Sequence, residues 1–344
     1  MLAATAKPKP ASPQARPAGA RFRPAPASGR LPHGRAPRIP IGPRLPRPAP
    51  SSSANLRATA LILASSLCFS LGDTIVKWLA QDFPVAQIVL FRSLACLPLL
   101  LLLRRADEPL LPRDLLHPVL LARSAFEIGV TAAFFGALAL MPLGDAVAIM
   151  FTAPILLTAL AGPLLGERVG WRRWLAVLAG FSGVLVVLRP GAGVYGSEAV
   201  LPLLAAACIA GRDLLVRRLP AGLDNRTVVL ATTLALLLYG AVASLWSWQP
   251  PTTALLLGAT AAAVTVTLAF LAYVDATRTA EVSYLQPFKY GAIPLSYLWG
   301  FLVFDDLPDA LALLGVALIV GSGLFIWHRE RALASRRRLA AEAR

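Results

Sequence analysis

Two stretches of the sequence decide the fold. Residues 145–188 are DAVAIMFTAPILLTALAGPLLGERVGWRRWLAVLAGFSGVLVVL, and residues 280–326 are AEVSYLQPFKYGAIPLSYLWGFLVFDDLPDALALLGVALIVGSGLFI. Each has an acid near its start, proline in mid-run, an acid in the following turn and a Gly-rich apolar end. The match indicates an internal repeat, with one copy in each half of the chain.

Apolar runs of the length needed to cross a bilayer follow one another from Arg57 onward. A helix needs about 20 apolar residues to span the hydrocarbon core, and 57% of the 344 residues are hydrophobic whereas only 15% are charged. Loops rich in Pro, Gly and charge separate the runs. The sequence therefore predicts an all-α integral membrane protein with ten spans, at 57–79, 85–103, 117–139, 144–165, 172–189, 197–215, 227–248, 253–274, 281–304 and 309–327.

The distribution of arginine supports this count. Cytoplasmic loops carry an excess of Lys and Arg, and the even-numbered loops are basic whereas the last odd loop holds Asp305, Asp306 and Asp309. Ten spans with both termini in the cytoplasm fit this alternation. Because each half has five spans, the two halves must run in opposite directions, and such inverted repeats are typical of secondary transporters.

The first 56 residues have a different composition. They hold ten of the Lys and Arg residues, thirteen of the 29 prolines and no acid. Such a segment cannot bury an apolar face and is expected to be disordered. A plain cytosolic tail is favoured; a targeting peptide and a segment that binds nucleic acid or anionic lipid are the alternatives. The predicted organisation is therefore a tail at 1–56, a first repeat at 57–190, a second at 197–328 and a basic tail at 329–344.

Several apparent motifs carry no chemistry. Three single cysteines form neither a disulfide framework nor a zinc site, and no metal or cofactor is expected. The G-x-G-x-x-G at 191–196 follows an apolar helix rather than a strand, so it is interpreted as a loop. The sequence has no G-x-x-x-x-G-K-S/T, so the chain does not power transport with ATP itself.

The chain resembles the EamA family of the drug/metabolite transporter superfamily. The resemblance lies in PILLTALAGPLLGERVGWRRWLAVLAGFSGVLVVLRPG (154–191), QIVLFRSLACLPLLLL (87–102) and LQPFKYGAIPLSYLWGFLVFDDLPDALALLGVALIVGSG (285–323). It implies two inverted five-helix EamA repeats and transport of a small solute, with riboflavin, S-adenosylmethionine and amino acids among the family's cargoes. The chain departs from the family where Asp305 and Asp306 replace the usual Gly-Glu of the second repeat.

Charged residues inside the spans are candidate site residues, because each is costly in lipid without a partner or a task. Asp73 and Lys77 lie one turn apart near the outer end of the first span. Lys77, with Trp78, is interpreted as an outer-interface anchor that snorkels to the headgroups. Asp73 is short and deeper, so it is a candidate for a water-filled cavity.

Arg92 in the second span has no acid within a turn. Two interpretations are open: a structural ion pair with Asp73 on the neighbouring span, which is favoured, or a clamp for a solute carboxylate, to which the guanidinium fork is suited.

Two further groups lie nearer the cytoplasmic side. Arg123 and Glu127 are four residues apart, a spacing that favours pairing; Arg123 is interpreted as a snorkelling residue. Glu127 is a candidate proton or cation acceptor, with a neutral hydrogen-bonded carboxyl as the alternative. Arg212 and Asp213 are adjacent, so they are expected to point to different faces, not to pair, and to act as interface anchors.

Lys289 is the strongest candidate for the solute site. It lies about 12 Å inside the ninth span at helical rise, between Pro287 and Pro294, where proline breaks expose backbone carbonyls. Tyr290 and Gln286 flank it. An ion pair of Lys289 with Glu127 or Asp73 is the alternative. Pro154, Pro287, Pro294 and the loop acid Glu167 are predicted to have structural or gating roles.

The sequence thus predicts a secondary transporter of a small organic solute in a bacterial inner membrane, working by alternating access and not as an enzyme. Proton coupling through Asp73 or Glu127 and uncoupled diffusion both fit. The expected partners are the solute and membrane lipids but no nucleic acid, and the protein is a monomer or homodimer. The alternative class, a membrane-embedded lipid-modifying enzyme, would need clustered carboxylates or histidines on cytosolic loops, which the Arg-rich loops lack.

Overall fold

The computed structural model describes residues 52–102, 112–165, 171–189, 195–216, 218–219, 223, 225–280 and 282–342, all of which belong to the compact unit Ala49–Arg344. Residues 1–51 of the tail expected at 1–56 lie outside the described residues, and residues 52–56 belong to α1. Within the described ranges the regular structure is helical: α1 Ser52–Leu79, α2 Val85–Leu102, η1 Arg113–Leu116, α3 Pro118–Leu140, α4 Leu143–Met150, α5 Ala153–Leu165, α6 Trp171–Leu188, η2 Ser197–Ala199, α7 Val200–Val216, α8 Asn225–Ala243, η3 Ser244–Trp246, α9 Thr253–Thr279, α10 Val282–Lys289, α11 Ala292–Phe304 and α12 Ala310–Glu342.

Eight helical stretches among the described residues are long and apolar enough to cross a membrane. They coincide with eight of the ten predicted spans: Asn55–Leu79, Val85–Leu102, Pro118–Leu140, Leu143–Leu160, Ser197–Val216, Arg226–Trp246, Thr253–Thr279 and Ala310–Arg329. The predicted span at 172–189 corresponds to α6, whose apolar part is shorter, Trp174–Leu188. The predicted span at 281–304 is divided between α10 and α11. Large apolar side chains, such as Leu102 and Leu302, remain exposed on the exterior, as lipid-facing surfaces require.

Two of the predicted spans, both with proline in mid-run, are interrupted in the structure. In 144–165 a turn at Phe151 and Thr152 separates α4 from α5, and Pro154 then stands in the first turn of α5, where its missing N–H costs nothing. In 281–304 a turn at Tyr290 and Gly291 separates α10 from α11. The interruptions place backbone polar groups in the interior of the unit, where helix-breaking sequence is tolerated only if it is buried in protein or lines a cavity.

Two other boundaries correct the sequence prediction. Helix α9 continues to Thr279 rather than stopping at 274, so Asp275 and Arg278 lie in a helix and not in a loop. Helix α12 continues to Glu342 through most of the segment expected to be a C-terminal tail. In α12 the residues beyond the apolar run are mostly Ala, Arg, Leu and Glu, good helix formers that allow the helix to continue after hydrophobicity ends.

The second half of the chain reproduces the helix pattern of the first. Helices α4 and α10 have 8 residues each, and α5 and α11 have 13 each. Helices α4, α5 and α6 start at Leu143, Ala153 and Trp171, and α10, α11 and α12 each start 139 residues later, at Val282, Ala292 and Ala310.

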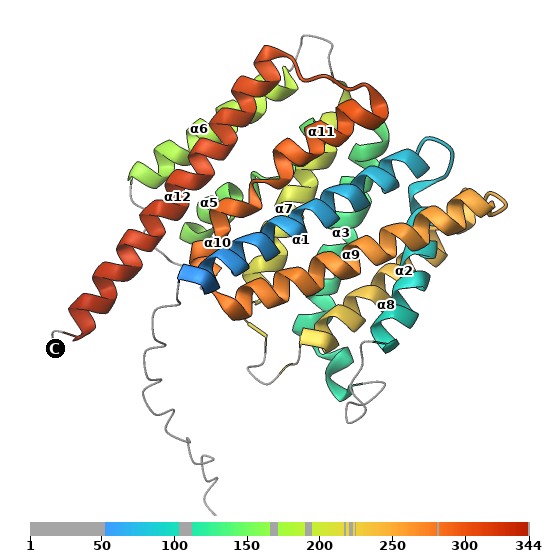
Figure 1. Ribbon diagram of the computed structural model, residues 1–344, viewed down its shortest axis with the longest axis horizontal. Coiled ribbons are helices and arrows are strands. Elements are labelled where there is room, and N and C mark those ends of the chain that lie inside the picture. Colours follow the sequence, from blue (N-terminus) through green and yellow to red (C-terminus); the bar gives the residue numbers. More distant parts are fainter. Residues whose placement is uncertain are drawn as a thin grey trace, which may run out of the picture. The chain divides into compact units, whose positions relative to one another are not determined.

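The most extensive helix contacts join the first half of the chain to the second. Figure 1 shows α1 alongside α9 and α6 alongside α12, and the most extensive contacts are α1 with α9, α6 with α12, α3 with α7 and α2 with α8. The core between them is centred on buried side chains such as Leu138, Leu143, Ile149, Ile155 and Ile293.

Candidate functional site

A polar cluster occupies one end of the helix unit, where α1, α3, α6 and α11 end and α4 and α12 begin. Its central residue is Asp145, in the first turn of α4, a position where the helix dipole favours a negative charge. Asp145 is only 7% exposed. Its carboxylate accepts a hydrogen bond of 2.6 Å from the Tyr297 hydroxyl of α11 and another from the Tyr195 hydroxyl.

Gly144 makes this arrangement possible, because a Cβ at that position would overlap the Tyr297 ring. Burial of the Tyr195 hydroxyl, together with its hydrogen bond to the Asp145 carboxylate, raises the pKa of Tyr195, so this tyrosine remains a neutral hydrogen-bond donor.

Lys77 lies at the same end and does not act as the predicted headgroup anchor. Its side chain is only 12% exposed and its Nζ lies 3.6 Å from Asp306 Oδ2. The ammonium donates to the carbonyls of Met141, at 2.7 Å, and Leu138, at 3.4 Å. These carbonyls belong to the C-terminal end of α3, where the helix leaves its last acceptors without intrahelical donors. The Lys77 ammonium therefore donates hydrogen bonds to the C-terminal carbonyls of α3 and forms an ion pair with Asp306 in the loop after α11.

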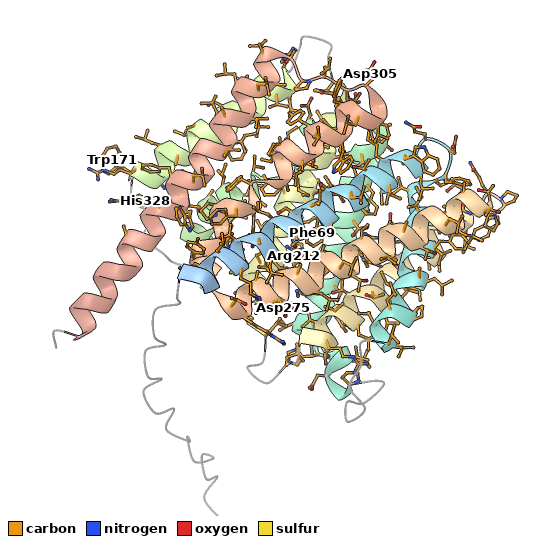
Figure 2. The ribbon with its side chains drawn as sticks, viewed as in Figure 1. Phe69, Trp171, Arg212, Asp275, Asp305 and His328 are labelled. Atoms are coloured by element: carbon orange, nitrogen blue, oxygen red, sulfur yellow. The ribbon has the colours of Figure 1, made fainter. Side chains whose placement is uncertain are left out.

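The third contact of this end joins Arg189, after α6, to Asp309, before α12, in an ion pair. The Asp309 carboxylate also accepts from the Ala312 amide at 2.8 Å and so caps α12. The Arg189 hydrogen bond and the Ala312 amide hold the pKa of Asp309 below its ordinary value. Arg189 and Asp305, at φ 44° and 57°, are the non-glycine residues with positive φ among those described; Figure 2 labels Asp305 at the end of α11. Such backbone strain is concentrated at functional sites.

A cavity of about 280 Å³ opens between these groups. The residues that line it include Asp145, Arg189, Tyr195, Tyr297, Asp306 and Asp309. We call these six residues, together with Lys77, which pairs with Asp306, the Asp145 cluster. Within the described ranges no group of three or more His, Cys, Asp or Glu side chains is placed to hold a metal ion. The cluster ties α1, α3, α4, α6, α11 and α12 together through paired charges and hydrogen bonds.

The interior charges Asp73 and Arg92 have no such partners. The two side chains are half-buried and do not form the predicted ion pair with each other; in the part of the chain that the structure describes, neither makes a hydrogen bond. Arg92 lies with its Cζ 4.7 Å from the centre of the Phe135 ring, and its Nε is buried without an acceptor.

Lys289 lies at the end of α10, beside the break in the helix. Its Nζ donates to the Tyr273 hydroxyl of α9 at 3.1 Å and lies 4.8 Å from the centre of that ring. The alternative ion pairs with Glu127 or Asp73 are not formed within the described residues. Tyr290 packs against Phe151 of the other broken helix, with ring centres 5.4 Å apart. Gln286, on the same helix as Lys289, is half-buried.

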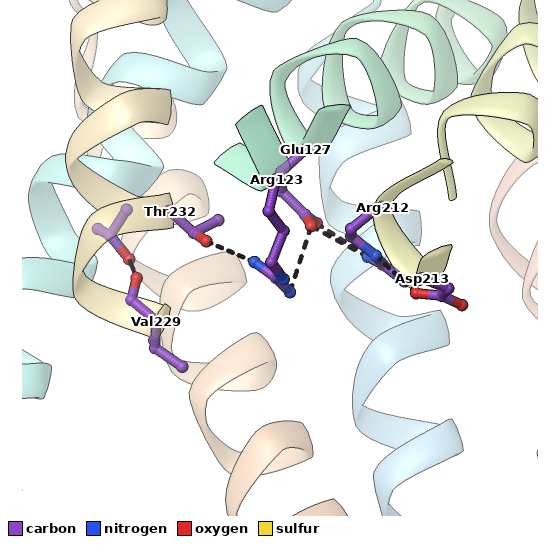
Figure 3. Close-up of polar contacts among 7 residues, drawn as sticks. Arg123, Glu127, Arg212, Asp213, Val229 and Thr232 are labelled. Atoms are coloured by element: carbon purple, nitrogen blue, oxygen red, sulfur yellow. Dashed lines mark hydrogen bonds and ion pairs between the residues drawn. The ribbon is translucent and has the colours of Figure 1, made fainter. Parts of the chain in front are cut away.

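Glu127 is brought into a different network, which Figure 3 shows between α3, α7 and α8. Both of its oxygens accept from Arg212 Nη1, at 3.0 and 3.2 Å, and Arg123 lies 3.8 Å away. Arg123 also donates to Thr232 rather than snorkelling to the surface. Two guanidinium groups therefore engage the carboxylate of Glu127.

The prediction that Arg212 and Asp213 cannot pair is wrong, because Arg212 Nε donates to Asp213 Oδ1 at 3.1 Å. Although the two Cα–Cβ bonds diverge around the helix, the long arginine side chain curls back to its neighbour. Arg212 joins α7 to α3 instead of serving as an interface anchor.

The predicted gating residues have different outcomes. Pro154 and Pro294 both lie in the first turn of a helix that follows an interruption, and Pro287 lies within α10. Glu167 lies outside the described residues. Sequence reasoning did not select Asp145, Tyr195, Tyr297 or Asp306 as site residues. A signal was present for Asp145, since it is the acid near the start of the first repeat.

Known proteins similar to this chain are membrane transporters. The profile of the EamA-like transporter family matches residues 56–189. A riboflavin transporter of Rhizobium johnstonii is 33% identical over 291 residues, which cover 81% of this chain and 93% of that protein. A riboflavin transporter of Vibrio cholerae is 34% identical over 58% of this chain and 67% of its own length. An S-adenosylmethionine uptake transporter of Rickettsia bellii is 26% identical over 80% of this chain and 94% of its own length.

Proposed function

The chain belongs to the EamA-like transporter family, and on that premise we propose that it carries riboflavin across a bacterial inner membrane by alternating access. It is a multi-pass membrane transporter and not an enzyme, so the alternative of a lipid-modifying enzyme is wrong. Riboflavin is chosen over S-adenosylmethionine because the two riboflavin transporters are 33–34% identical to the chain, against 26% for the S-adenosylmethionine uptake transporter of Rickettsia bellii.

The observation that carries the transport mechanism is the pair of broken helices. The interruptions at Phe151–Thr152 and at Tyr290–Gly291 occupy corresponding places in the two halves, and the rings of Phe151 and Tyr290 pack together across them. Interrupted apolar segments at corresponding positions of two halves are the best pointer to a transporter's binding site. We place the solute site beside this contact, lined by Lys289, Tyr290 and Gln286 and extending to Asp73 and Arg92.

We further propose that the chain crosses the membrane ten times as two inverted five-helix repeats. The constant offset of 139 residues between the starts of α4, α5 and α6 and those of α10, α11 and α12 supports this arrangement. So does the packing, since the contact of α1 with α9 has its counterpart in α7 with α3, and the contact of α1 with α10 in α7 with α4. In this arrangement α6 and the pair α10–α11 are the fifth and ninth spans.

The orientation follows from charge. Basic loops favour the cytoplasm, so we place both termini there and the Asp145 cluster on the outer side. Because the cluster joins helices of both halves, we assign it the role of an outer gate that holds the site closed to the outside. Glu127, engaged by two arginines, is assigned a structural role, which leaves Asp73 as the candidate for proton coupling.

Uptake by proteoliposomes that contain the full chain tests the proposal. Radiolabelled riboflavin and S-adenosylmethionine are supplied separately, each with and without an imposed pH gradient, and empty liposomes serve as the control. We expect saturable riboflavin accumulation that exceeds the control. Accumulation of S-adenosylmethionine alone would refute riboflavin as the cargo, and a riboflavin rate that ignores the pH gradient would refute coupling through Asp73.

A further inference from the structure

The half-buried pair Asp73 and Arg92 presents opposite hydrogen-bonding capacity in the interior of the unit. Arg92 carries five N–H donors and no acceptor, and an ionised Asp73 carries acceptors only. Neither side chain makes a hydrogen bond among the described residues, and the Nε of Arg92 is buried without any acceptor. In membrane proteins an intramembrane ionisable residue left in this condition indicates a functional site.

The position of Arg92 is fixed although it has no polar partner. Its guanidinium lies over the Phe135 ring of α3, and such cation–π contact holds the plane of the group while leaving the N–H donors at its edge free. Asp73 lies one turn before Lys77 on α1 and therefore deeper than the Asp145 cluster. Beside it, the helix backbones of α1 and α9 approach closely, since a Cβ at Gly72 would lie 2.8 Å from the Thr265 hydroxyl.

We propose that Arg92 and Asp73 together bind the imide edge of a planar heteroaromatic solute. Arg92 donates to an imide carbonyl oxygen, and Asp73 accepts from the adjacent imide N–H. The pyrimidinedione edge of the flavin ring offers this sequence of carbonyl, N–H and carbonyl. The inference rests on the proposed function and adds to it the two residues that select the flavin ring rather than its ribityl chain.

A methyl group on the imide nitrogen provides the test, because it removes the one donor that Asp73 would accept. Binding of riboflavin and of 3-methylriboflavin is measured by flavin fluorescence on the detergent-solubilised full chain. The variants are Asp73→Leu, Asp73→Asn, Arg92→Met and Arg92→Lys. Asp275→Leu, which alters an exposed carboxylate on α9, is the matched control. Leucine and methionine are apolar and are compatible with membrane insertion.

The wild type and Asp275→Leu should bind riboflavin about tenfold or more tightly than 3-methylriboflavin, the loss expected for one hydrogen bond to a charged group. In Asp73→Leu the two ligands should bind equally, whereas Asp73→Asn, which keeps an acceptor, should retain part of the preference. Arg92→Met should weaken both ligands by a similar factor, and Arg92→Lys should recover part of that loss.

Three results would overturn the inference. If Asp73→Leu keeps the full preference for riboflavin over 3-methylriboflavin, Asp73 does not accept a hydrogen bond from the imide N–H. If Arg92→Met binds both flavins as the wild type does, Arg92 does not contact the ring. If the wild type binds S-adenosylmethionine but neither flavin, the proposed cargo and this inference fail together, whereas the first two results leave riboflavin transport standing.

Discussion

The Asp145 cluster and the interior charges are built from similar residue types, yet their charges are satisfied in opposite ways. In the cluster, Lys77 has two carbonyls and a carboxylate, and Asp145 has two tyrosine hydroxyls. In the interior, and among the described residues, the Arg92 guanidinium lies over one aromatic ring without a hydrogen bond, and the Lys289 ammonium donates to one tyrosine hydroxyl. The cluster's polar groups therefore hold helices to one another, whereas the interior groups are the ones that we propose for binding a solute.

The largest effect is expected at Lys289, which we expect to contribute to transport but not to the stability of the fold. Lys289→Ala should reduce riboflavin transport by about tenfold to a hundredfold, because it removes a charged donor from the solute site. Insertion and thermal stability should remain near the wild type, since among the described residues the Lys289 ammonium makes a single hydrogen bond, of 3.1 Å, to the Tyr273 hydroxyl. Uptake and unfolding temperature are measured on the same preparation. Tyr273→Phe, which keeps the ring, is the control; a normal transport rate in Lys289→Ala would remove Lys289 from the site.

The next largest effect is expected at Lys77, where a substitution should reduce the stability of the fold. Lys77→Met should lower the free energy of unfolding by about 2–3 kcal/mol, because it leaves the last carbonyls of α3 without their donor and the Asp306 carboxylate without its paired charge. The apparent unfolding temperature in detergent checks this. Adding Asp306→Asn should restore part of the loss by removing the unpaired charge. If Lys77→Met is as stable as the wild type, the side chain is a surface anchor after all.

A smaller effect is expected at Tyr297. Tyr297→Phe removes one hydrogen bond to Asp145 while Tyr195 still donates, so the free energy of unfolding should fall by about 1 kcal/mol. Tyr195→Phe should cost a similar amount, and the double variant should cost more than the two together, since it leaves the buried Asp145 with neither hydroxyl. Strict additivity in this cycle would contradict a shared carboxylate.

The smallest effect is expected at Arg189, whose ion pair with Asp309 lies in the more exposed part of the cluster. Side-chain exposure of Asp309 is 55%, so the effect of Arg189→Ala on the unfolding temperature should be slight and should vanish at high salt. The pKa of Asp309 is lowered in the folded protein. The pair's stabilisation is therefore present above the ordinary aspartate pKa and is lost only as the pH falls through the lowered value. A difference between Arg189→Ala and the wild type that grows from pH 6 to pH 8 would contradict this assignment.

The sequence predicted the helices better than it predicted the site. Apolar length places eight spans, because hydrophobicity alone decides which segments enter lipid. The breaks between α4 and α5 and between α10 and α11 were indicated by Pro154, Pro287 and Pro294. However, a proline in the first turn of a helix does not show where the preceding helix ends. The turn at Tyr290 and Gly291 depends on packing against Phe151, which is distant in the sequence.

Candidate site residues stand out in the sequence where a charge is rare and lies within an apolar run, as for Asp73, Arg92 and Lys289, and their role in a solute site stays a prediction. Their partners were not predictable. Asp145 binds hydroxyls 50 and 152 residues further along the chain, and Lys77 turned inward because the end of α3 offers it carbonyls. Such contacts are set by tertiary packing, about which local spacing carries no information.

We propose that the Asp145 cluster closes the outer side of the protein and must open during transport. A reversible cross-link between the two halves tests this role. A Cβ built on Gly300 of α11 lies 3.8 Å from the Cβ of Leu143 of α4, a separation typical of disulfides. Leu143→Cys and Gly300→Cys are combined in a chain whose Cys68, Cys96 and Cys208 are replaced by serine, and each single substitution serves as a control. We expect that oxidation to the disulfide stops riboflavin uptake in the double variant alone and that a reductant restores uptake. Uptake by the oxidised, cross-linked protein at the rate of the reduced protein would contradict the claim.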